Sequence, residues 1–321
     1  MTDRSKPADL SQIRTYSIRS RPTKVDHTVL AKVPNIHQPM GEFFEALPGV
    51  LKAKELLLAS QRVAEARIHD KGIILMMGGH VVKCGLSPII IRMMEERLIT
   101  CIVMNGAATI HDFELAHFGT TSEDVEANLE DGMFGMVRET PEMMNKIVSD
   151  GVRFGCGLGE SLGRGLRHLL PKYERISVLA NAHRLGVPLT VHVALGTDTI
   201  HQHPSCNGEA FGKGGMRDFR WLAGIVPTLD DGGVIINCGS AVILPEVFLK
   251  ALTVARNLGN SVKKFTAINM DMIQHYRPMT NVVNRPTRGG GTPISLTGHH
   301  EIMIPLLYAG IKSFLKEYRQ G

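Results

Sequence analysis

The chain has 321 residues, 43% of them hydrophobic, with 36 Lys+Arg against 31 Asp+Glu and a formal net charge of +5. This composition is that of an ordinary globular protein, and it excludes a disordered or collagen-like chain. The five cysteines never form a C-x-x-C pair, so they predict neither a disulfide framework nor a structural zinc site. We therefore expect a protein of the reducing cytoplasm.

The charge pattern argues against two classes of partner. Outside the N-terminal segment the basic residues are dispersed, and one Trp, 5 Tyr and 11 Phe offer little aromatic surface for stacking bases. No apolar run approaches the length of a membrane span, and the charged N-terminus is not a secretory signal. We expect neither nucleic acid nor a membrane as partner, whereas the positive balance suits an anionic ligand.

The N-terminal segment differs from the rest of the chain. Residues 1–40 contain four prolines, several basic residues and little periodicity, which predicts an extended arm. No linker or internal repeat divides the remainder, so residues 41–321 are predicted to form a single α/β domain. Two glycine-rich stretches, 156–166 and 284–298, are predicted to be loops over a site.

The class of fold follows from a regular alternation of short apolar runs with segments of helical periodicity. Each apolar run ends in small or polar residues, which is typical of buried parallel strands that feed helices. The pattern predicts a doubly wound, mostly parallel, Rossmann-like sheet. The predicted strands are 72–79, 99–107, 186–196, 233–241 and 263–271, and the predicted helices lie within 43–70, 87–98, 110–119 and 245–260.

The ends of these strands predict a nucleotide-sized site, because ligands of doubly wound sheets bind beyond the carboxyl ends of the strands. Small residues there let a ligand approach the backbone closely. A G-x-G-x-x-G fingerprint does not follow any of the strands. The candidate cofactor-binding residues are Gly78, Gly79, His80, Asn105, Gly106, Ala107, Gly239, Ser240, Asn269 and Met270.

Side chains suited to acid–base chemistry stand close to the same strand ends. The candidate catalytic residues are His111, Asp112, Asp198, His299 and His300. Helix capping competes with catalysis as the role of Asp112 and of the segment 297–301. His201 and His203 form an H-x-H pair, which is a weaker hypothesis for a metal site.

The ordered set of segments resembles the deoxyhypusine synthase family over about residues 70–312. The resemblance rests on GGHVVKCGLSPIIIRMMEERLITCIVMNGAATIHDFELAHFG, ANAHRLGVPLTVHVALGTDTIHQHPS, GGVIINCGSAVILPEVF, FTAINMD and EIMIPLLYAGI. It implies a homotetramer with active sites between paired subunits, NAD as cofactor and a small-molecule amine such as spermidine as substrate. It also implies that nine of the candidate cofactor residues, all but Gly78, line NAD, and that His111, Asp112 and Asp198 face the amine or the nicotinamide.

One departure from the family changes the expected reaction. The family transfers an aminobutyl group through an imine on a lysine in a Ser-Trp-Gly-Lys segment, but this chain has no lysine between Lys264 and Lys312. An imine requires a lysine amine. We therefore expect an NAD-dependent enzyme that oxidises an amine or polyamine-like substrate by hydride transfer, with His111 or His299 accepting the proton and Lys83 as a possible relocated amine.

Two alternatives remain open on the sequence. The first is a metal-dependent hydrolase or lyase that uses Asp198, His201, His203 and the group His299-His300-Glu301. The second is a non-catalytic, oligomeric member of the family.

Overall fold

The computed structural model describes residues 7–35 and 37–320, and they contain a six-stranded sheet in which every strand is parallel to its neighbours. The strand order is β3-β2-β1-β4-β5-β6. The predicted doubly wound, Rossmann-like class is thereby confirmed, and the five predicted strands correspond to β1–β5. The strands are β1 (Ile73–Met77), β2 (Cys101–Asn105), β3 (Leu189–His192), β4 (Val234–Cys238), β5 (Thr266–Asp271) and β6 (Thr292–Thr297).

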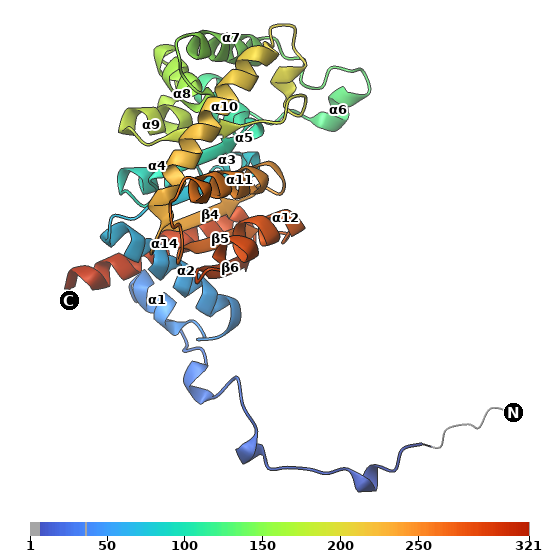
Figure 1. Cartoon of the computed structure of the whole chain (residues 1–321), viewed down its shortest axis with the longest axis vertical. Helices are drawn as coiled ribbons and strands as arrows, with labels where there is room; N and C mark the ends of the chain where they lie inside the picture. The colour runs from blue at the N-terminus through green and yellow to red at the C-terminus, as the bar shows by residue number, and fades with distance from the viewer. Residues whose placement is uncertain (1–6, 36, 321) are drawn as a thin grey trace, which may run out of the picture.

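Helices cover both faces of the sheet (Figure 1). The longer ones are α2 (Leu51–Ile68), α4 (Ser87–Glu95), α5 (Gly106–Phe118), α7 (Glu139–Arg153), α8 (Leu158–His168), α9 (Val178–Leu185), α10 (Gly208–Ile225), α11 (Ile243–Asn257) and α14 (His300–Gln320). The shorter ones are α1 (Met40–Ala46), α3 (Gly79–Lys83), α6 (Val125–Leu129), α12 (Tyr276–Pro278) and α13 (Arg285–Thr287).

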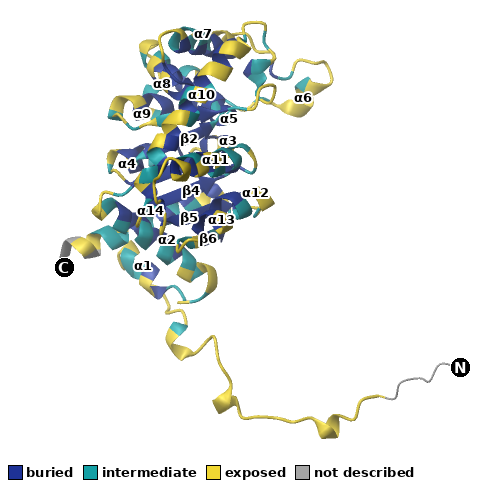
Figure 2. Ribbon diagram, in the orientation of Figure 1, coloured by how far each residue is buried: buried dark blue, intermediate teal, exposed yellow. Residues whose placement is uncertain are grey.

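The strands β1–β5 are buried on both sides, as the dark centre of the sheet in Figure 2 shows. Successive side chains of a strand point to opposite faces. Ile73, Leu75 and Met77 therefore join a core with α2, α4, α9 and α14, whereas Ile74 and Met76 join a second core with α11 and the end of α10. This burial explains why the strands read as continuous apolar runs rather than as alternating ones.

The prediction that residues 156–166 form a loop is wrong. Most of this glycine-rich stretch belongs to α8, and its glycines serve close packing. A Cβ added at Gly159 would lie 2.1 Å from the carbonyl oxygen of Leu189, and one at Gly163 would lie 2.8 Å from that of Leu179. The glycines thus let α8 approach the backbones of β3 and α9, a gain that outweighs their low helix propensity.

The predicted loop at 284–298 is also wrong in part, since it contains α13 and the edge strand β6. Only Ile294 and Leu296 of β6 are buried, and Pro293 lies in the strand at the edge of the sheet, where the lack of an N–H is tolerated. A further difference is the long connection from β2 to β3, which holds α5–α9 and not the single predicted helix.

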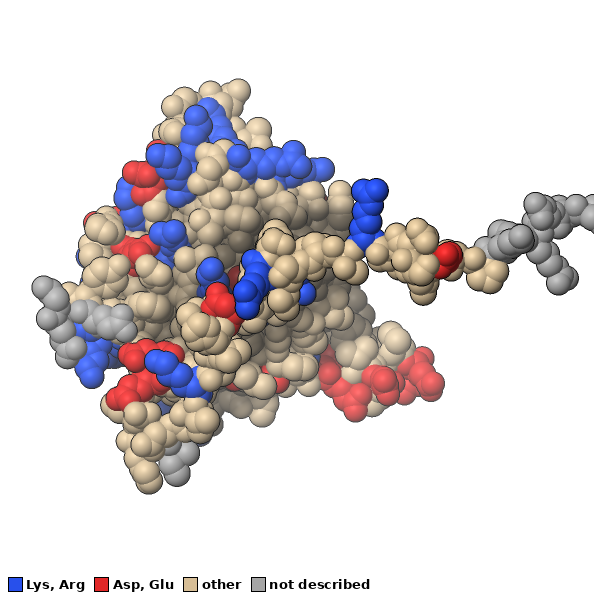
Figure 3. Space-filling view, turned by 90° about the horizontal axis from the view of Figure 1, so that it is seen from below, with Lys and Arg blue, Asp and Glu red and all other residues tan. Residues whose placement is uncertain are grey.

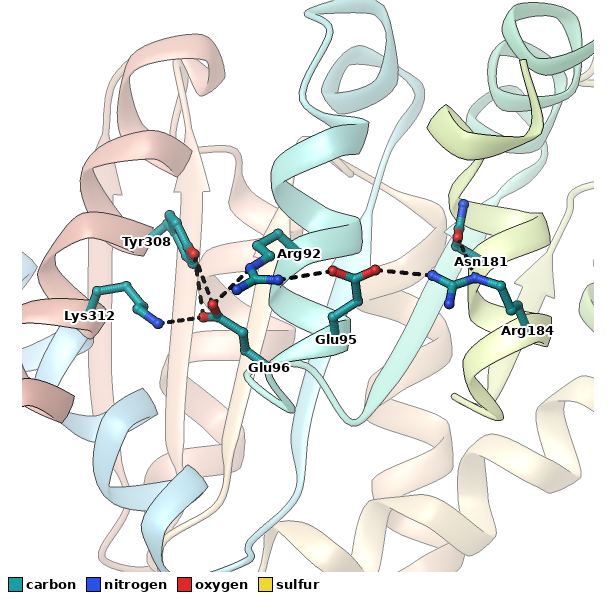
Figure 4. Close-up of polar contacts among 7 residues, drawn as sticks. All are labelled: Arg92, Glu95, Glu96, Asn181, Arg184, Tyr308 and Lys312. Carbon is teal, nitrogen blue, oxygen red and sulfur yellow. Dashed lines mark hydrogen bonds and ion pairs between the residues drawn. The ribbon is translucent and has the colours of Figure 1, made fainter. Parts of the chain in front are cut away.

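A chain of ion pairs on the surface joins three helices (Figure 4). Arg92 of α4 pairs with Glu95 and Glu96, Lys312 of α14 pairs with Glu96, and Arg184 of α9 pairs with Glu95. Burial acts to raise the pKa of Glu96, but the hydrogen bond and charge of Lys312, together with Arg92, hold that pKa below its ordinary value. The network links α14, α4 and α9 across the surface.

The described part of the N-terminal segment extends away from the folded body (Figure 1). Its regular structure is limited to three short turns, at residues 10–12, 18–20 and 27–29. Among the residues that the structure describes, no helix is both long and apolar enough to cross a membrane.

Candidate active site

Two glycine turns meet at the centre of the carboxyl edge of the sheet. They follow β1 and β4, the neighbouring strands at which the order of the strands along the chain reverses. A Cβ added at Gly78 would lie 2.1 Å from the carbonyl oxygen of Gly239. Gly239 has a φ of +70°, and a Cβ there would lie 2.8 Å from Nε2 of His300. Only glycine fits at both positions, because any side chain there would clash. The backbones of the two turns and the imidazole of His300 therefore lie together at the place where doubly wound sheets bind their ligands.

His300 is the best-placed of the predicted histidines. It begins α14, is 1% exposed, and its ring centroid lies 5.7 Å from that of His80. Its Nε2 lies 3.9 Å from Oδ1 of Asp271 and has no hydrogen-bond partner, although it is buried. Burial lowers the pKa of His300 against the opposing effect of Asp271. The neighbouring His299 is exposed and lies 3.9 Å from the Glu301 carboxylate, so it does not join this group.

A second buried group without a partner lies at the end of β2. Oδ2 of Asp198 would be 1.9 Å from a Cβ added at Gly106, and no described residue donates a hydrogen bond to it. Burial raises the pKa of Asp198 to about 6. Asn105, at the end of β2, caps α5 by accepting a hydrogen bond from the backbone N–H of Ala108. Its side chain therefore shapes the Gly106 turn.

His111 connects these two regions. Its Cδ2 would lie 3.0 Å from a Cβ added at Gly79, and it lines a cavity of about 270 Å³ together with Ala107 and Asp198. The other cavity residues that carry charge are Lys83, Glu114 and Glu123. His111 and Asp198 line the cavity and lie against Gly79 and Gly106, so the cavity is directly beside the glycine turns.

The protonation of His111 follows from its neighbours. Thr121 donates its only hydroxyl proton to Oε2 of Glu114 at 2.5 Å. Nδ1 of His111, which is 2.8 Å from the Thr121 oxygen, must then carry the proton of that contact. The lone pair is left on Nε2, beside the Gly79 turn. Burial, reinforced by the charge of Lys83, lowers the pKa of His111 to about 4, so the ring is neutral at physiological pH.

Three of the predicted residues have other contacts. Asp112 is buried and accepts hydrogen bonds from Oγ of Ser177 and from the backbone N–H groups of Val178 and Leu179, so it fixes the start of α9. Met270 is 1% exposed within the apolar core. Asn269 accepts a hydrogen bond from Asn237 inside the sheet. These contacts serve the packing of the fold, and none of the three side chains is among the residues that line the cavity.

Ser240 and the H-x-H pair also serve the backbone. Ser240 Oγ accepts a hydrogen bond from the N–H of Leu244 near the start of α11. Nδ1 of His201 accepts from Gly196 and Asp198, and Nδ1 of His203 accepts from Ser205. No group of three or more metal-ligating side chains occurs within residues 7–35 and 37–320. The hydrolase or lyase alternative thus has no ligand set in the described chain.

Thr121 and Glu123 were missed by reasoning from the sequence, whereas Glu114 stands with His111 and Asp112 in the polar group that follows the second predicted strand. Glu114 carried a signal, because it follows His111 by three residues and therefore shares its face of the helix. Thr121 and Glu123 carried none. They belong to the segment after α5, and only its fold brings them to the cavity.

No protein-family model matches the chain, and no curated protein matches it. Among solved structures, the ternary complex of AgrE with ornithine and NAD⁺ is similar at 13% identity and a TM-score of 0.52, covering 84% of this chain and 35% of that one. Unliganded AgrE matches at 14% identity and a TM-score of 0.50, covering 82% and 34%. The chain thus spans about a third of the length of AgrE.

A protein of Entamoeba histolytica assigned as a deoxyhypusine synthase matches at 10% identity and a TM-score of 0.47, covering 85% of this chain and 93% of that one. That score is below the level at which a common fold is inferred. What the AgrE structures establish is the Rossmann-like fold that the chain shares with part of AgrE.

Proposed function

We propose that the chain is an NAD-dependent enzyme that oxidises a small, positively charged amine. The observation that carries the proposal is the pair of buried, unpartnered atoms, Nε2 of His300 and Oδ2 of Asp198, each set against a glycine turn at the carboxyl edge. Buried polar atoms nearly always have a partner. Of the eight buried side-chain atoms that lack a hydrogen-bond partner in the described residues, these two lie against the glycine turns where this fold binds ligands, which supports a ligand that completes them.

The residues at this edge fit a dinucleotide. The turns at Gly78–Gly79, Gly106–Ala107 and Gly239 offer backbone without side chains, which suits the close approach of a pyrophosphate. NAD⁺, when bound, supplies a hydride acceptor. In the AgrE complex the same class of fold is found with ornithine and NAD⁺, which supports a cofactor and a cationic amine on one such scaffold.

The cavity beside the turns suits the amine. Glu114, Glu123 and Asp198 provide carboxylates that attract an ammonium group. NAD⁺ held at these turns would supply the hydride acceptor, and Nε2 of His111 would take one N–H proton of the substrate ammonium; loss of the hydride and the proton together would leave an iminium carbon. The fixed Nδ1–H tautomer keeps that Nε2 lone pair available.

Group transfer is a second candidate reaction, because Lys83 lines the same cavity as His111. The Nζ of Lys83 would add to the iminium carbon, and the original amine would leave. The variant Lys83→Arg keeps the charge but cannot form the adduct. Turnover that is unchanged in this variant would remove the transfer reaction and leave the oxidation in place.

The experiment that tests the proposal is a spectrophotometric screen for reduction of NAD⁺ with diamines, polyamines and basic amino acids. We expect one class of amine to reduce NAD⁺, and Asp198→Asn to lower kcat/KM by at least tenfold while His203→Ala changes it little. If no amine or alcohol reduces NAD⁺, or if Asp198→Asn is fully active, the proposal fails and a non-catalytic role gains weight.

A further inference from the structure

Two exposed segments of the molecule have net charges of opposite sign, and both carry apolar side chains that are exposed to solvent. The first is the arm, residues 7–35, which carries five basic and two acidic residues. The second is the acidic projection, residues 120–137, which carries five acidic residues and no basic one. Figure 1 shows α6, the helix of the acidic projection, standing out from the body. In Figure 3 a cluster of acidic side chains projects on the same side.

Both segments expose large apolar side chains. Seven of the arm are between 60 and 96% exposed, namely Leu10, Ile13, Tyr16, Ile18, Val25, Leu30 and Val33. Five of the acidic projection are between 43 and 61% exposed, namely Val125, Leu129, Met133, Met136 and Val137. Apolar side chains gathered on a protruding segment are typical of an interaction surface.

In both segments, charged side chains lack ion-pair partners among the described residues. None of the five basic side chains of the arm forms an ion pair with a described residue, and the same holds for Glu126, Glu130 and Asp131 of the acidic projection. Each segment therefore presents apolar surface flanked by charges of predominantly one sign, positive in the arm and negative in the acidic projection, so that the two segments are complementary.

The geometry points to the arm of one copy of the chain docking on the acidic projection of a second copy. The arm is tied to its own fold by hydrogen bonds from Lys32 N–H to Ala46 and from Gly49 N–H to Val29. These contacts hold it next to α1, which lies at the other end of the folded body from α6, and from there the arm runs outwards (Figure 1). A second copy is thus the better-placed acceptor. This inference does not rest on the proposed function.

The test uses the full chain in light and ¹⁵N-labelled forms. The two forms are mixed at high salt, which weakens ionic contacts, returned to low salt, and treated with a carbodiimide that joins lysine to carboxylate without a spacer. We expect Lys24 or Lys32 to be joined to Glu126, Glu130 or Asp131, with about half of the joined peptides carrying one light and one heavy partner.

Charge reversal supplies the controls. Glu126→Arg with Glu130→Arg removes the cross-links, whereas Glu160→Arg with Glu209→Arg, an equal change of charge at exposed sites away from both segments, leaves them. Mixing the projection variant with a chain carrying Arg19→Glu and Arg21→Glu restores an association that neither variant shows alone. Cross-links confined to one label, or their absence from the wild-type chain, would overturn the inference.

Discussion

Buried carboxylates occur in two regions of the molecule and have different surroundings. On the flank formed by α8, α9 and β3, Asp112 accepts three hydrogen bonds at the start of α9, and Asp218 accepts hydrogen bonds from the backbone N–H groups of Gly159 and Val191. At the carboxyl edge, Asp198 is also buried, but its Oδ2 has no partner.

The pKa values alone do not separate the two regions. Burial raises the pKa of Asp112 and Asp198 to about 6 and that of Asp218 to about 7. The difference lies in their hydrogen bonds. The flank carboxylates accept hydrogen bonds from backbone N–H groups and so hold that backbone in place, whereas Oδ2 of Asp198 accepts none. A perturbed pKa therefore marks a candidate site only where the hydrogen bonds are incomplete.

The largest expected effect comes from removing a flank carboxylate. Asp112→Ala leaves the N–H groups of Val178 and Leu179 and the hydroxyl of Ser177 buried without an acceptor, which should lower the free energy of unfolding by about 3 kcal/mol or more. Urea unfolding of Asp112→Ala and Asp198→Ala checks the contrast. If Asp198→Ala is destabilised as much as Asp112→Ala, the two regions do not differ as described.

A pH series sharpens the comparison at Asp198. Its folded-state pKa of about 6 exceeds the unfolded value of 3.8, so the folded chain binds the proton more tightly and loses stability as the pH rises from about 4 to about 6. Asp198→Asn cannot ionise. Its stability relative to the wild type should therefore rise across that range, by up to about 3 kcal/mol. Urea unfolding at pH 4, 5, 6 and 7 measures this difference, and a constant difference would refute it.

The glycine turns allow a matched pair of substitutions. Gly85 and Gly239 both have left-handed backbones, with φ of +76° and +70°, but a Cβ at Gly85 meets open space whereas one at Gly239 would press on His300. Gly85→Ala should cost about 1–2 kcal/mol from the backbone alone, and Gly239→Ala should cost more. Equal losses in thermal unfolding would show that His300 is not held against the turn.

The smallest effect on stability is expected at Thr121. Thr121→Val removes the hydroxyl between Glu114 and His111 and should release the fixed Nδ1–H tautomer, whereas Thr121→Ser keeps it. ¹⁵N chemical shifts of the His111 ring report the tautomer directly. The same tautomer in Thr121→Val and the wild type would show that Thr121 does not position this ring.

The sequence predicted much of this fold because the buried strands are short apolar runs that end in small residues. It predicted Asp198 and the glycine turns at the carboxyl edge for the same reason, since they follow predicted strands, but it took the stretch that holds β6, the strand before His300, for a loop. It failed at α8, where glycines that read as a loop allow close helix packing, and it did not reveal that Asp112 accepts hydrogen bonds from the start of the distant helix α9. Such contacts depend on tertiary structure and leave no periodic signal.

The central claim is that the glycine turns at the carboxyl edge bind NAD⁺. Calorimetric titration of NAD⁺ into the wild type, Asn105→Asp and His203→Ala tests it most directly. Asp is as good a helix cap as Asn, so Asn105→Asp should keep the fold while placing a negative charge beside the Gly106 turn. We predict micromolar binding by the wild type and His203→Ala and its loss in Asn105→Asp. No binding by the wild type, or equal binding by all three chains, would contradict the account.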